Sequence, residues 1–343
     1  MPFPVLQQTY VHSINPYAIQ LSPAFGIRWY GLAYLIGFIA AYLLFGYLAR
    51  RRLTPLSPAA VSDFVFAVAL GTIIGGRLGY CVFYDPKLFI KLSASFPFWG
   101  VLEIHRGGMS SHGGMIGIAM ACILFGSKHK IPIFSLCDLC ALAAGIGIFF
   151  GRIANFINGE LVGRPCSPSL PWAVKFPQDI LAWPYQAPDR LTALSSIVER
   201  LGIDREQWLS LTLQNPLSGI VETTLYRIIA AVQLGDSTMA QALGQLLTPR
   251  HPSQIYEALL EGVFLFCAML YLWRKSRQPG VITASFFIIY SIVRIFAEQF
   301  RMPDAQIGFQ WLGLTRGQWL SVALLLVGLI LLWKVGTRRL VNS

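Results

Sequence analysis

Long apolar stretches recur along the chain, and they constrain its fold more than any other feature. A helix needs about 20 apolar residues to cross the hydrocarbon core of a bilayer. The third of seven such stretches is the weakest, because it is short and has Ser, His and Gly near its start. The stretches cover about residues 25–48, 61–80, 109–126, 133–156, 253–273, 281–300 and 319–335. The sequence therefore predicts an all-α polytopic membrane protein with about seven transmembrane helices.

The composition supports a membrane protein. Hydrophobic residues make up 55% of the 343 residues and charged residues only 13%, whereas soluble domains carry about 25% charged residues. The formal net charge of +11 would suggest a nucleic-acid partner in a soluble protein. Here the basic residues lie between apolar stretches, which is typical of membrane topology, so no nucleic-acid partner is expected.

The positions of Lys and Arg predict the orientation in the membrane. Basic residues are enriched in short loops on the cytoplasmic side. They follow the first, third, fifth and seventh stretches as Arg50, Arg51 and Arg52; Lys128 and Lys130; Arg274, Lys275 and Arg277; and Lys334, Arg338 and Arg339. The N-terminus is then outside and the C-terminus inside. Seven spans fit this alternation, whereas six or eight would break it. The N-terminal residues lack a basic region and an early apolar run, so no cleavable signal peptide is expected.

Three parts are predicted along the chain. Residues 1–163 hold spans one to four and an external aromatic segment, 81–108, which lies in the membrane interface or dips back into the bilayer. Residues 164–250 form an external, periplasmic head, in which Asp204 and Asp236 are candidate N-caps of small amphipathic helices. Residues 251–343 hold spans five to seven and a cytoplasmic tail.

Several chemistries are disfavoured by the absence of their motifs. The six cysteines form no disulfide framework, and the CxxC of Cys137 and Cys140 is interpreted as small hydrophobic residues in a helix. The sequence has no HExxH spacing, no P-loop and no GxSxG elbow. Metalloprotease, ATPase and serine-hydrolase activities are therefore not expected, and no metal is implied.

Polar residues inside the predicted spans are the main functional signal. A charge there costs roughly 2.5–3.5 kcal/mol on insertion scales and usually faces a cavity or a partner. The predicted topology places residues of five spans in the outer half of the bilayer: Tyr30, His112, Arg152, Asn155, Asn158, Glu160, His251, Tyr256, Glu257, Glu261, Tyr290, Arg294, Glu298 and Arg301.

Simpler explanations exist for some of these residues. Arg294 and Glu298 are four residues apart on a helix and could neutralise each other, and Arg152 could extend to the headgroups. One of Glu257 and Glu261 is expected to be structural. Outside this set, Arg77 is interpreted as a headgroup contact, and Asp138 as favourable at the N-terminus of its own helix.

The glycines at 107–114 surround His112 and suggest a broken helix, which membrane proteins tolerate where it lines a cavity or is buried in protein. Two arginines facing one cavity would bind an anion, and the natural anion at that depth is a phospholipid phosphate. A neighbouring histidine can accept a proton near neutral pH. The residues thus suggest acid–base chemistry on a phospholipid.

Five motifs closely resemble those of the bacterial prolipoprotein diacylglyceryl transferases. They cover most of the membrane part and read GRIANFINGELVGR (151–164), RWYGLAY (28–34), GGMSSHGGMIG (107–117), RHPSQIYEALLEG (250–262) and YSIVRIFAEQFRMPDAQ (290–306). Two departures stand out. Ala154 occupies a position where the family signature usually has Gly, and the head from about residue 166 to 249 is longer than expected for the family.

The resemblance implies transfer of the sn-1,2-diacylglyceryl group of phosphatidylglycerol to the lipobox cysteine of a preprolipoprotein, with release of glycerol 1-phosphate. It implies location in the bacterial inner membrane and no cofactor. Arg152 would be the main phosphatidylglycerol ligand, Arg294 its partner and His112 the candidate base, although a substrate phosphate oxygen is an alternative base. Four further residues match family positions that are important for activity: Tyr30, Asn155, Glu160 and Gly163. Tyr290 would contact the lipid, and Glu298 would orient Arg294.

Two other functions remain as alternatives. A transporter would also use broken helices and buried charges, but the polar residues lie in the outer half of the bilayer and the sequence has no internal repeat. A lipid-binding scaffold without catalysis would need no histidine beside its arginines.

Overall fold

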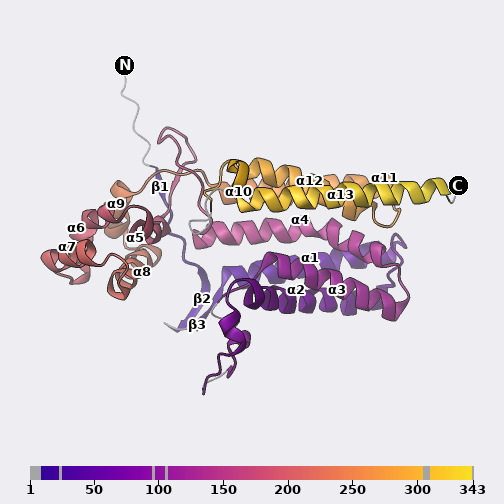
Figure 1. The fold of residues 1–343 in the computed structure, drawn as a ribbon, viewed down its shortest axis with the longest axis horizontal. Helices are drawn as coiled ribbons and strands as arrows, with labels where there is room; N and C mark the ends of the chain where they lie inside the picture. Colours follow the sequence, from indigo (N-terminus) through magenta and orange to yellow (C-terminus); the bar gives the residue numbers. More distant parts are fainter. Residues whose placement is uncertain (1–8, 23–24, 95–96, 105–106, 304–309, 342–343) are drawn as a thin grey trace. The chain divides into compact units, whose positions relative to one another are not determined.

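The computed structural model describes residues 9–22, 25–94, 97–104, 107–303 and 310–341 (Figure 1). The chain forms two compact units, and the boundary between them falls within several helices. Unit 1 comprises Met1–Tyr34, Ile148–Glu261 and Ser291–Val322. Unit 2 comprises Leu35–Gly147, Gly262–Tyr290 and Ala323–Ser343.

Each of the seven apolar stretches is helical for most of its length, so a mostly helical polytopic membrane protein is confirmed. Five helical segments are long and apolar enough to cross a membrane among the described residues, while α12 is shorter and α3 falls outside that group. The helices are α1 (Trp29–Arg50), α2 (Val61–Phe83), α3 (Ser111–His129), α4 (Ile133–Asn158), α10 (Ser253–Glu257) continued by a π-helical segment (Ala258–Phe264) and α11 (Leu265–Lys275), α12 (Val281–Ala297) and α13 (Arg316–Val341).

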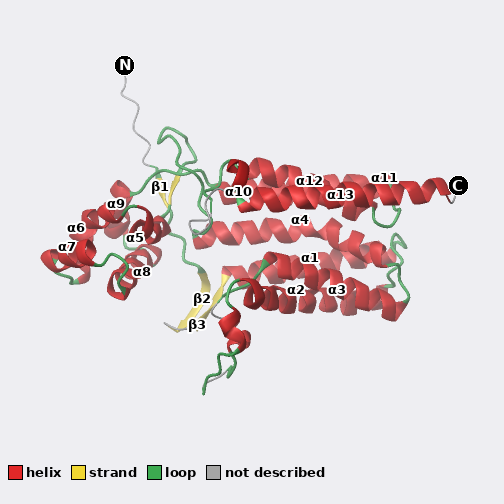
Figure 2. Ribbon diagram, viewed as in Figure 1, coloured by secondary structure: helices red, strands yellow, loops and turns green. Residues whose placement is uncertain are grey.

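The predicted start of the first helix is wrong. Phe25–Arg28 form strand β3, which pairs antiparallel with β2 (Tyr17–Ser22), and α1 begins only at Trp29 (Figure 2). An apolar strand that leads directly into an apolar helix gives one continuous hydropathy signal, so periodicity does not separate the two. The sixth helix likewise ends at Ala297, three residues before the predicted end.

Glycines pack α2 closely against α3 in unit 2, where the two helices lie side by side (Figure 1). A Cβ atom on Gly113 would collide with the carbonyl oxygen of Gly75, and one on Gly117 with that of Gly71. Glycines four residues apart allow helix backbones to approach in this way. Gly113 therefore serves helix packing and lies inside α3, so the expected broken helix is wrong: α3 is continuous from Ser111, and Ser110 caps it by accepting from the Gly113 N–H.

Two buried polar residues of unit 2 correct their sequence-based interpretation. Asp138 accepts hydrogen bonds from the Gly280 N–H (2.8 Å) and from the N–H and hydroxyl of Thr283 (2.8 and 2.6 Å), so it caps the start of α12 instead of acting on its own helix. Arg77 is only 4% exposed, and its guanidinium donates to backbone carbonyls. It is therefore no headgroup contact.

Segment 81–108, which the sequence predicts to be external, contains no spanning helix among its described residues. Its described residues include the 3-10 turns Pro86–Phe89 and Gly100–Leu102. Ile90 and Leu92 are about four-fifths exposed. This apolar surface is what a segment in the membrane interface would carry.

Residues 164–250 lie in unit 1 and contain a hydrophobic core of their own, with Trp208, Leu194 and Leu243 fully buried. Both predicted N-caps are confirmed: Asp204 accepts from the Glu206 and Gln207 N–H groups, and Asp236 accepts from that of Met239. The elements are β4 (Val174–Lys175), α5 (Trp183–Gln186), α6 (Ser195–Val198), α7 (Arg205–Gln214), α8 (Gly219–Gln233) and α9 (Ser237–Leu246).

The N-terminal strand β1 (Tyr10–Val11) pairs parallel with β4 and buries His12 beside it. The His12 ring lies 5.3 Å from the ring of Phe156 and 5.4 Å from that of Phe176. Burial among these rings lowers the pKa of His12 to about 4, because an apolar environment disfavours the imidazolium. The folded protein therefore holds this histidine neutral.

We expect Gly117→Leu to lower the unfolding temperature of the detergent-purified protein by several degrees. The new side chain would collide with the Gly71 carbonyl, and overpacking typically costs about 1–3 kcal/mol. Gly46→Ala is the control, because its Cβ meets no atom within 4 Å and alanine favours the helix by up to about 1 kcal/mol. Equal unfolding temperatures for Gly117→Leu and wild type would contradict close packing.

We expect the wild-type protein to lose stability relative to His12→Phe as the pH falls. In the unfolded chain this histidine takes up a proton near its ordinary pKa of 6.5, whereas in the folded protein its pKa is about 4. Stability from the neutral His12 is thus complete above pH 6.5 and is lost between pH 6.5 and 4. Thermal unfolding at about pH 7.5 and about pH 5, on either side of the ordinary histidine pKa, measures this difference. A gap between the two proteins that does not change with pH would contradict it.

Candidate active site

A network of buried ion pairs in unit 1 joins two arginines through two glutamates. The Arg152 guanidinium, from α4, lies 3.0 Å from Glu257 Oε2 and 2.8 Å from Glu261 Oε2. The Arg294 guanidinium, from α12, lies 2.5 Å from Glu257 Oε1 and 3.0 Å from Glu261 Oε1. Each carboxylate therefore bridges both arginines. Neither Glu257 nor Glu261 is exposed, and the two make equivalent contacts, so the expectation that one of them is structural stays a prediction.

The local fold of the fifth apolar stretch places these carboxylates. Glu257 ends α10, and Glu261 lies within the π-helical segment that follows. π-helical turns are rare and frequently occur at functional sites. The helical pitch changes between Glu257 and Glu261. In this geometry both carboxylates contact the same two guanidinium groups.

Two further charges complete the network. Glu298 Oε2 lies 2.6 Å from Arg294, and the Thr315 hydroxyl donates to Glu298 Oε1 over 3.1 Å. Arg301 lies 3.7 Å from Glu257. Gly317 approaches Glu298 so closely that a Cβ there would lie 3.1 Å from its carboxylate. Glu298 thus contacts Arg294 on one side and Thr315 and Gly317 on the other.

Among the described residues, the ion pairs of the network join three arginines and three glutamates, so the formal charge of this set is zero. A buried charge without a partner costs several kcal/mol, and pairing removes that cost here. Arg152 has the most exposed side chain of the three arginines, at 15% against 10% for Arg294 and 11% for Arg301. Arg152 is therefore slightly more accessible than the other two arginines.

The backbone that follows α4 is held by Arg250 and by the first two residues of α10. The Gln254 amide donates to the Glu160 carbonyl, the Ser253 hydroxyl to the Leu161 carbonyl and Arg250 Nη1 to the Gly163 carbonyl. Arg250 in turn forms a buried ion pair with Asp179 at 2.7 Å.

Gly163 is a position that needs glycine, because a Cβ would collide with the His251 carbonyl oxygen. The close approach lets Gly163 pair with Arg301, and Pro165, two residues later, pairs with Arg250. The three segments therefore meet in one close backbone junction.

Polar side chains meet at the end of α4. The Asn155 amide nitrogen lies 3.5 Å from the Tyr30 hydroxyl and 3.3 Å from Glu160 Oε2, and the Asn158 amide donates to Glu160 Oε1 over 3.1 Å. Asn155 is buried, whereas Glu160 is exposed. The structure thus brings together Tyr30, Asn155 and Glu160, which the sequence identified separately.

His112 and Tyr290 belong to unit 2, apart from the arginine network of unit 1 in the division of the chain. His112 is the second residue of α3 and is half-buried. The Tyr290 ring stacks on that of Phe286 at 5.5 Å. Tyr290 is the first residue of the motif at 290–306. The last three residues of this motif, 304–306, lie outside the described part of the chain.

Sequence reasoning missed the full extent of the network. Glu257, Glu261 and Arg301 were not among the predicted site residues, although all lie at the same predicted depth as Arg152 and Arg294. The available signal was the charge count: the residues predicted at this depth include four carboxylates and three guanidinium groups, and such charges call for mutual pairing.

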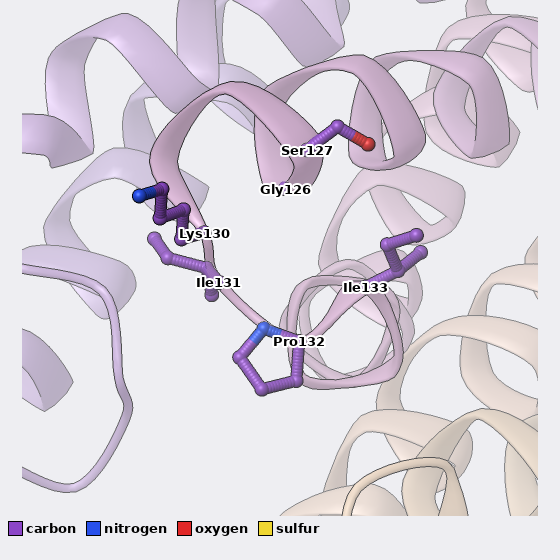
Figure 3. Close-up of a pocket in the computed structure, with 6 residues that line it drawn as sticks. All are labelled: Gly126, Ser127, Lys130, Ile131, Pro132 and Ile133. Carbon is purple, nitrogen blue, oxygen red and sulfur yellow. The ribbon is translucent and has the colours of Figure 1, made fainter.

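The hollows of the described structure include two small ones. One, of about 210 Å³, lies in unit 1 beside the network, and its lining residues are Leu161, Val162, Asp179, Ala182, Gln186, Arg250, Arg301, Met302 and Pro303. The other, of about 370 Å³, lies at the turn between α3 and α4 in unit 2 and is lined by Gly126, Ser127, Lys130, Ile131, Pro132 and Ile133 (Figure 3). Lys130 is the only charged residue among those that line the second hollow, so this turn lacks an acid–base pair.

A model of the prolipoprotein diacylglyceryl transferase family matches residues 16–334, which include every residue of the network. The chain belongs to this family. Like its members, it is a transferase of lipoprotein biosynthesis.

Three bacterial relatives illustrate the similarity, and each is named a phosphatidylglycerol–prolipoprotein diacylglyceryl transferase. The protein of Bdellovibrio bacteriovorus is 52% identical over 94% of this chain and 93% of its own length. That of Rhodospirillum rubrum is 38% identical over 96% and 92%, and that of Burkholderia lata 37% identical over 96% and 98%. Because these transferases are matched over nearly their whole length, a head of about this size is not peculiar to this chain.

We expect Glu261→Gln to have two opposite effects. Loss of one carboxylate charge leaves the network with a formal charge of +1, so binding of an anionic phospholipid should tighten several-fold, since charges near 4 Å interact by up to about 4 kcal/mol in such a site. The unfolding temperature should fall, because Arg152 and Arg294 each lose a charged partner.

Tryptophan fluorescence during titration with dioleoyl phosphatidic acid, together with thermal unfolding, measures both effects. Glu222→Gln, an exposed glutamate of α8, is the matched control and should change neither. Weaker lipid binding by Glu261→Gln than by wild type would show that the carboxylate does not compete with the lipid anion.

Proposed function

We propose that this chain transfers the sn-1,2-diacylglyceryl group of phosphatidylglycerol to the lipobox cysteine thiol of preprolipoproteins, the first step of bacterial lipoprotein maturation. The reaction forms a thioether and releases glycerol 1-phosphate. The names of the relatives support these substrates. The observation that carries the proposal is the buried network in which Glu257 and Glu261 hold Arg152 and Arg294 together.

Paired arginines suit the anion of this reaction. A guanidinium group binds a phosphate through two parallel N–H donors. As the glycerol carbon–oxygen bond breaks, negative charge grows on the phosphate, and donors already in place stabilise that charge without reorganisation. In this proposal Arg152, the more exposed arginine, is the main phosphatidylglycerol ligand, and Arg294 is its partner across the phosphate.

The proton of the cysteine thiol must leave before the sulfur attacks. A free thiol has a pKa of about 8.5, so a base raises the fraction of thiolate. We assign His112 as the base, with a phosphate oxygen of the substrate as the alternative. The thiolate forms the sulfur–carbon bond, the carbon–oxygen bond to the phosphate breaks, and the proton passes to the departing glycerol 1-phosphate.

The other site residues support this reaction. Tyr30, Asn155 and Glu160 form the polar group at the end of α4, and Gly163 allows the close backbone junction beside it. We assign Glu298 to orient Arg294 and Tyr290 to contact the lipid. Thiolate displacement at a carbon of a phosphate ester requires no redox or metal chemistry, so the proposal includes no cofactor, and phosphatidylglycerol is a substrate.

The proposed topology places the site where its substrates meet. Seven spans, with the N-terminus outside and the C-terminus inside, satisfy the alternation of basic loops. Residues 1–163 and 251–343 then form the membrane part, and residues 164–250 form a periplasmic head. The proposed location is the bacterial inner membrane, where phosphatidylglycerol and lipobox signal peptides are both present.

We expect Arg152→Ala to reduce diacylglyceryl transfer by at least about a hundredfold, the usual effect of removing a donor that stabilises developing charge. The assay reconstitutes the purified protein with phosphatidylglycerol labelled in its acyl chains and a lipobox peptide, and it measures label on the peptide cysteine. Arg274→Gln, an exposed arginine at the end of α11, is the control and should keep wild-type activity.

Three results would contradict this proposal. Near-normal turnover by a correctly inserted Arg152→Ala would remove Arg152 from the reaction. Accumulation of lipid or peptide in vesicles without any thioether product would favour a transporter. Tight phosphatidylglycerol binding by the wild type without transfer would favour a lipid-binding scaffold.

A further inference from the structure

Arg77 of α2 is a buried arginine whose four hydrogen bonds all end on backbone carbonyls. Its Nε donates to the Val101 carbonyl over 2.7 Å, and its Nη2 donates to that of Gly100 over 2.7 Å. Its Nη1 donates to the carbonyls of Gly107 and Gly108 over 2.8 and 3.0 Å. One guanidinium group in unit 2 thus joins two separate points of the segment between α2 and α3.

Only an arginine fits this arrangement well. The guanidinium is planar and directs its five N–H donors along fixed, divergent directions. The Nε and Nη2 donors serve the 3-10 turn at Gly100–Leu102, while Nη1 serves the two glycines on the other side. A lysine ammonium is a single point charge and can reach one of these two places but not both.

The second point that Arg77 holds, at Gly107 and Gly108, lies shortly before α3. Gly107 and Gly108 have φ angles of +89° and +79°, which favour glycine. A Cβ on Gly108 would lie 2.8 Å from Arg77 Nη1 and 2.7 Å from the Tyr80 ring. The backbone at this point is therefore shaped to receive the guanidinium group.

The connection continues to His112. The Ser110 N–H donates over 2.8 Å to the carbonyl of Gly76, the neighbour of Arg77, and the Ser110 hydroxyl caps α3 at Gly113. His112 is the second residue of this helix. The pair Gly76–Arg77 thus holds the backbone at Gly100, Val101, Gly107, Gly108 and Ser110, and only Ser111 separates the last of these points from His112.

We propose that Arg77 is a positioning residue that fixes the first turn of α3 and thereby the imidazole of His112. This inference rests on the proposed role of His112 as the base. The glycine contacts between α2 and α3 begin at Gly113, one residue after His112, and fix the helix from that point onward. The residues before Gly113 depend on the preceding backbone, because the first N–H groups of a helix lack intrahelical partners. Without Arg77, Gly107 and Gly108 regain their conformational freedom, and the imidazole loses its defined place.

A displaced base slows the chemical step more than it weakens lipid binding. A misplacement of about 1 Å can cost on the order of 10² in rate. The arginine network that is proposed to bind the phosphate lies in unit 1 and contains none of the residues that Arg77 contacts. Arg77→Gln should therefore lower kcat on the order of 10²-fold and change KM for phosphatidylglycerol by less than about twofold.

The experiment compares wild type, Arg77→Gln, Arg77→Lys and Arg274→Gln in the reconstituted transfer assay. The same proteins are treated with diethyl pyrocarbonate, and mass spectrometry measures the rate at which His112 is modified. His129, at the other end of α3 and stacked on Phe125 at 4.1 Å, is the internal reference. In Arg77→Gln the modification of His112 should accelerate several-fold relative to His129. Arg77→Lys should be intermediate in kcat and in modification rate, and Arg274→Gln should match wild type.

The inference would be overturned by wild-type kcat in Arg77→Gln, by a rise in KM with unchanged kcat, or by an unchanged ratio of His112 to His129 modification. If Arg77→Gln does not fold, Arg77→Lys decides by the same three readouts, with wild-type values in all of them overturning the inference. Absence of transfer by the wild type would refute the proposed function, and the modification ratio would still test whether Arg77 positions His112.

Discussion

The pairing of buried charges is the interaction on which unit 1 depends. Water cannot solvate a guanidinium or carboxylate group at membrane depth, so each needs a partner of opposite charge. Glu257 and Glu261 come from the fifth apolar stretch, Arg152 from α4 and Arg294 from α12. Because each carboxylate contacts both arginines, loss of alignment in one helix would break contacts with both others. The charges thus fix three helices of this unit and align the two arginines at once.

The same stretch of chain also shapes the backbone beside the network. Arg250, Ser253 and Gln254 hold the carbonyls that follow α4, and Glu257 and Glu261 follow them within the next eight residues. The 250–261 segment therefore positions the signature backbone and the arginine side chains together. Because the segment positions both the backbone and the arginines, the sequence motif at 250–262 is long and polar although it opens an apolar helix.

The sequence predicted features whose signal is local. All seven apolar stretches are helical because the length of an apolar run is itself the property that a membrane helix needs, and Asp204 and Asp236 cap helices because capping acts within three residues. It failed where a partner is distant: Arg77 bonds to carbonyls 23 to 31 residues away, and Asp138 caps a helix through a residue 142 positions later. For Glu257 and Glu261 the depth could be predicted but not the pairing, and for β3 an apolar strand resembled the start of the helix.

The structure stabilises its buried arginines in two different ways, and the difference bears on function. Arg152 and Arg294 are held by carboxylates, which carry full negative charge and can yield part of their contact to another anion. Arg77 is held by carbonyl dipoles of a folded backbone, and an anion that displaced them would also have to unfold the segment. Carboxylate pairing therefore suits an arginine that must exchange partners during a reaction, whereas carbonyl pairing suits one that must keep its surroundings fixed. On this physical ground alone, the two sets of arginines are expected to differ in role.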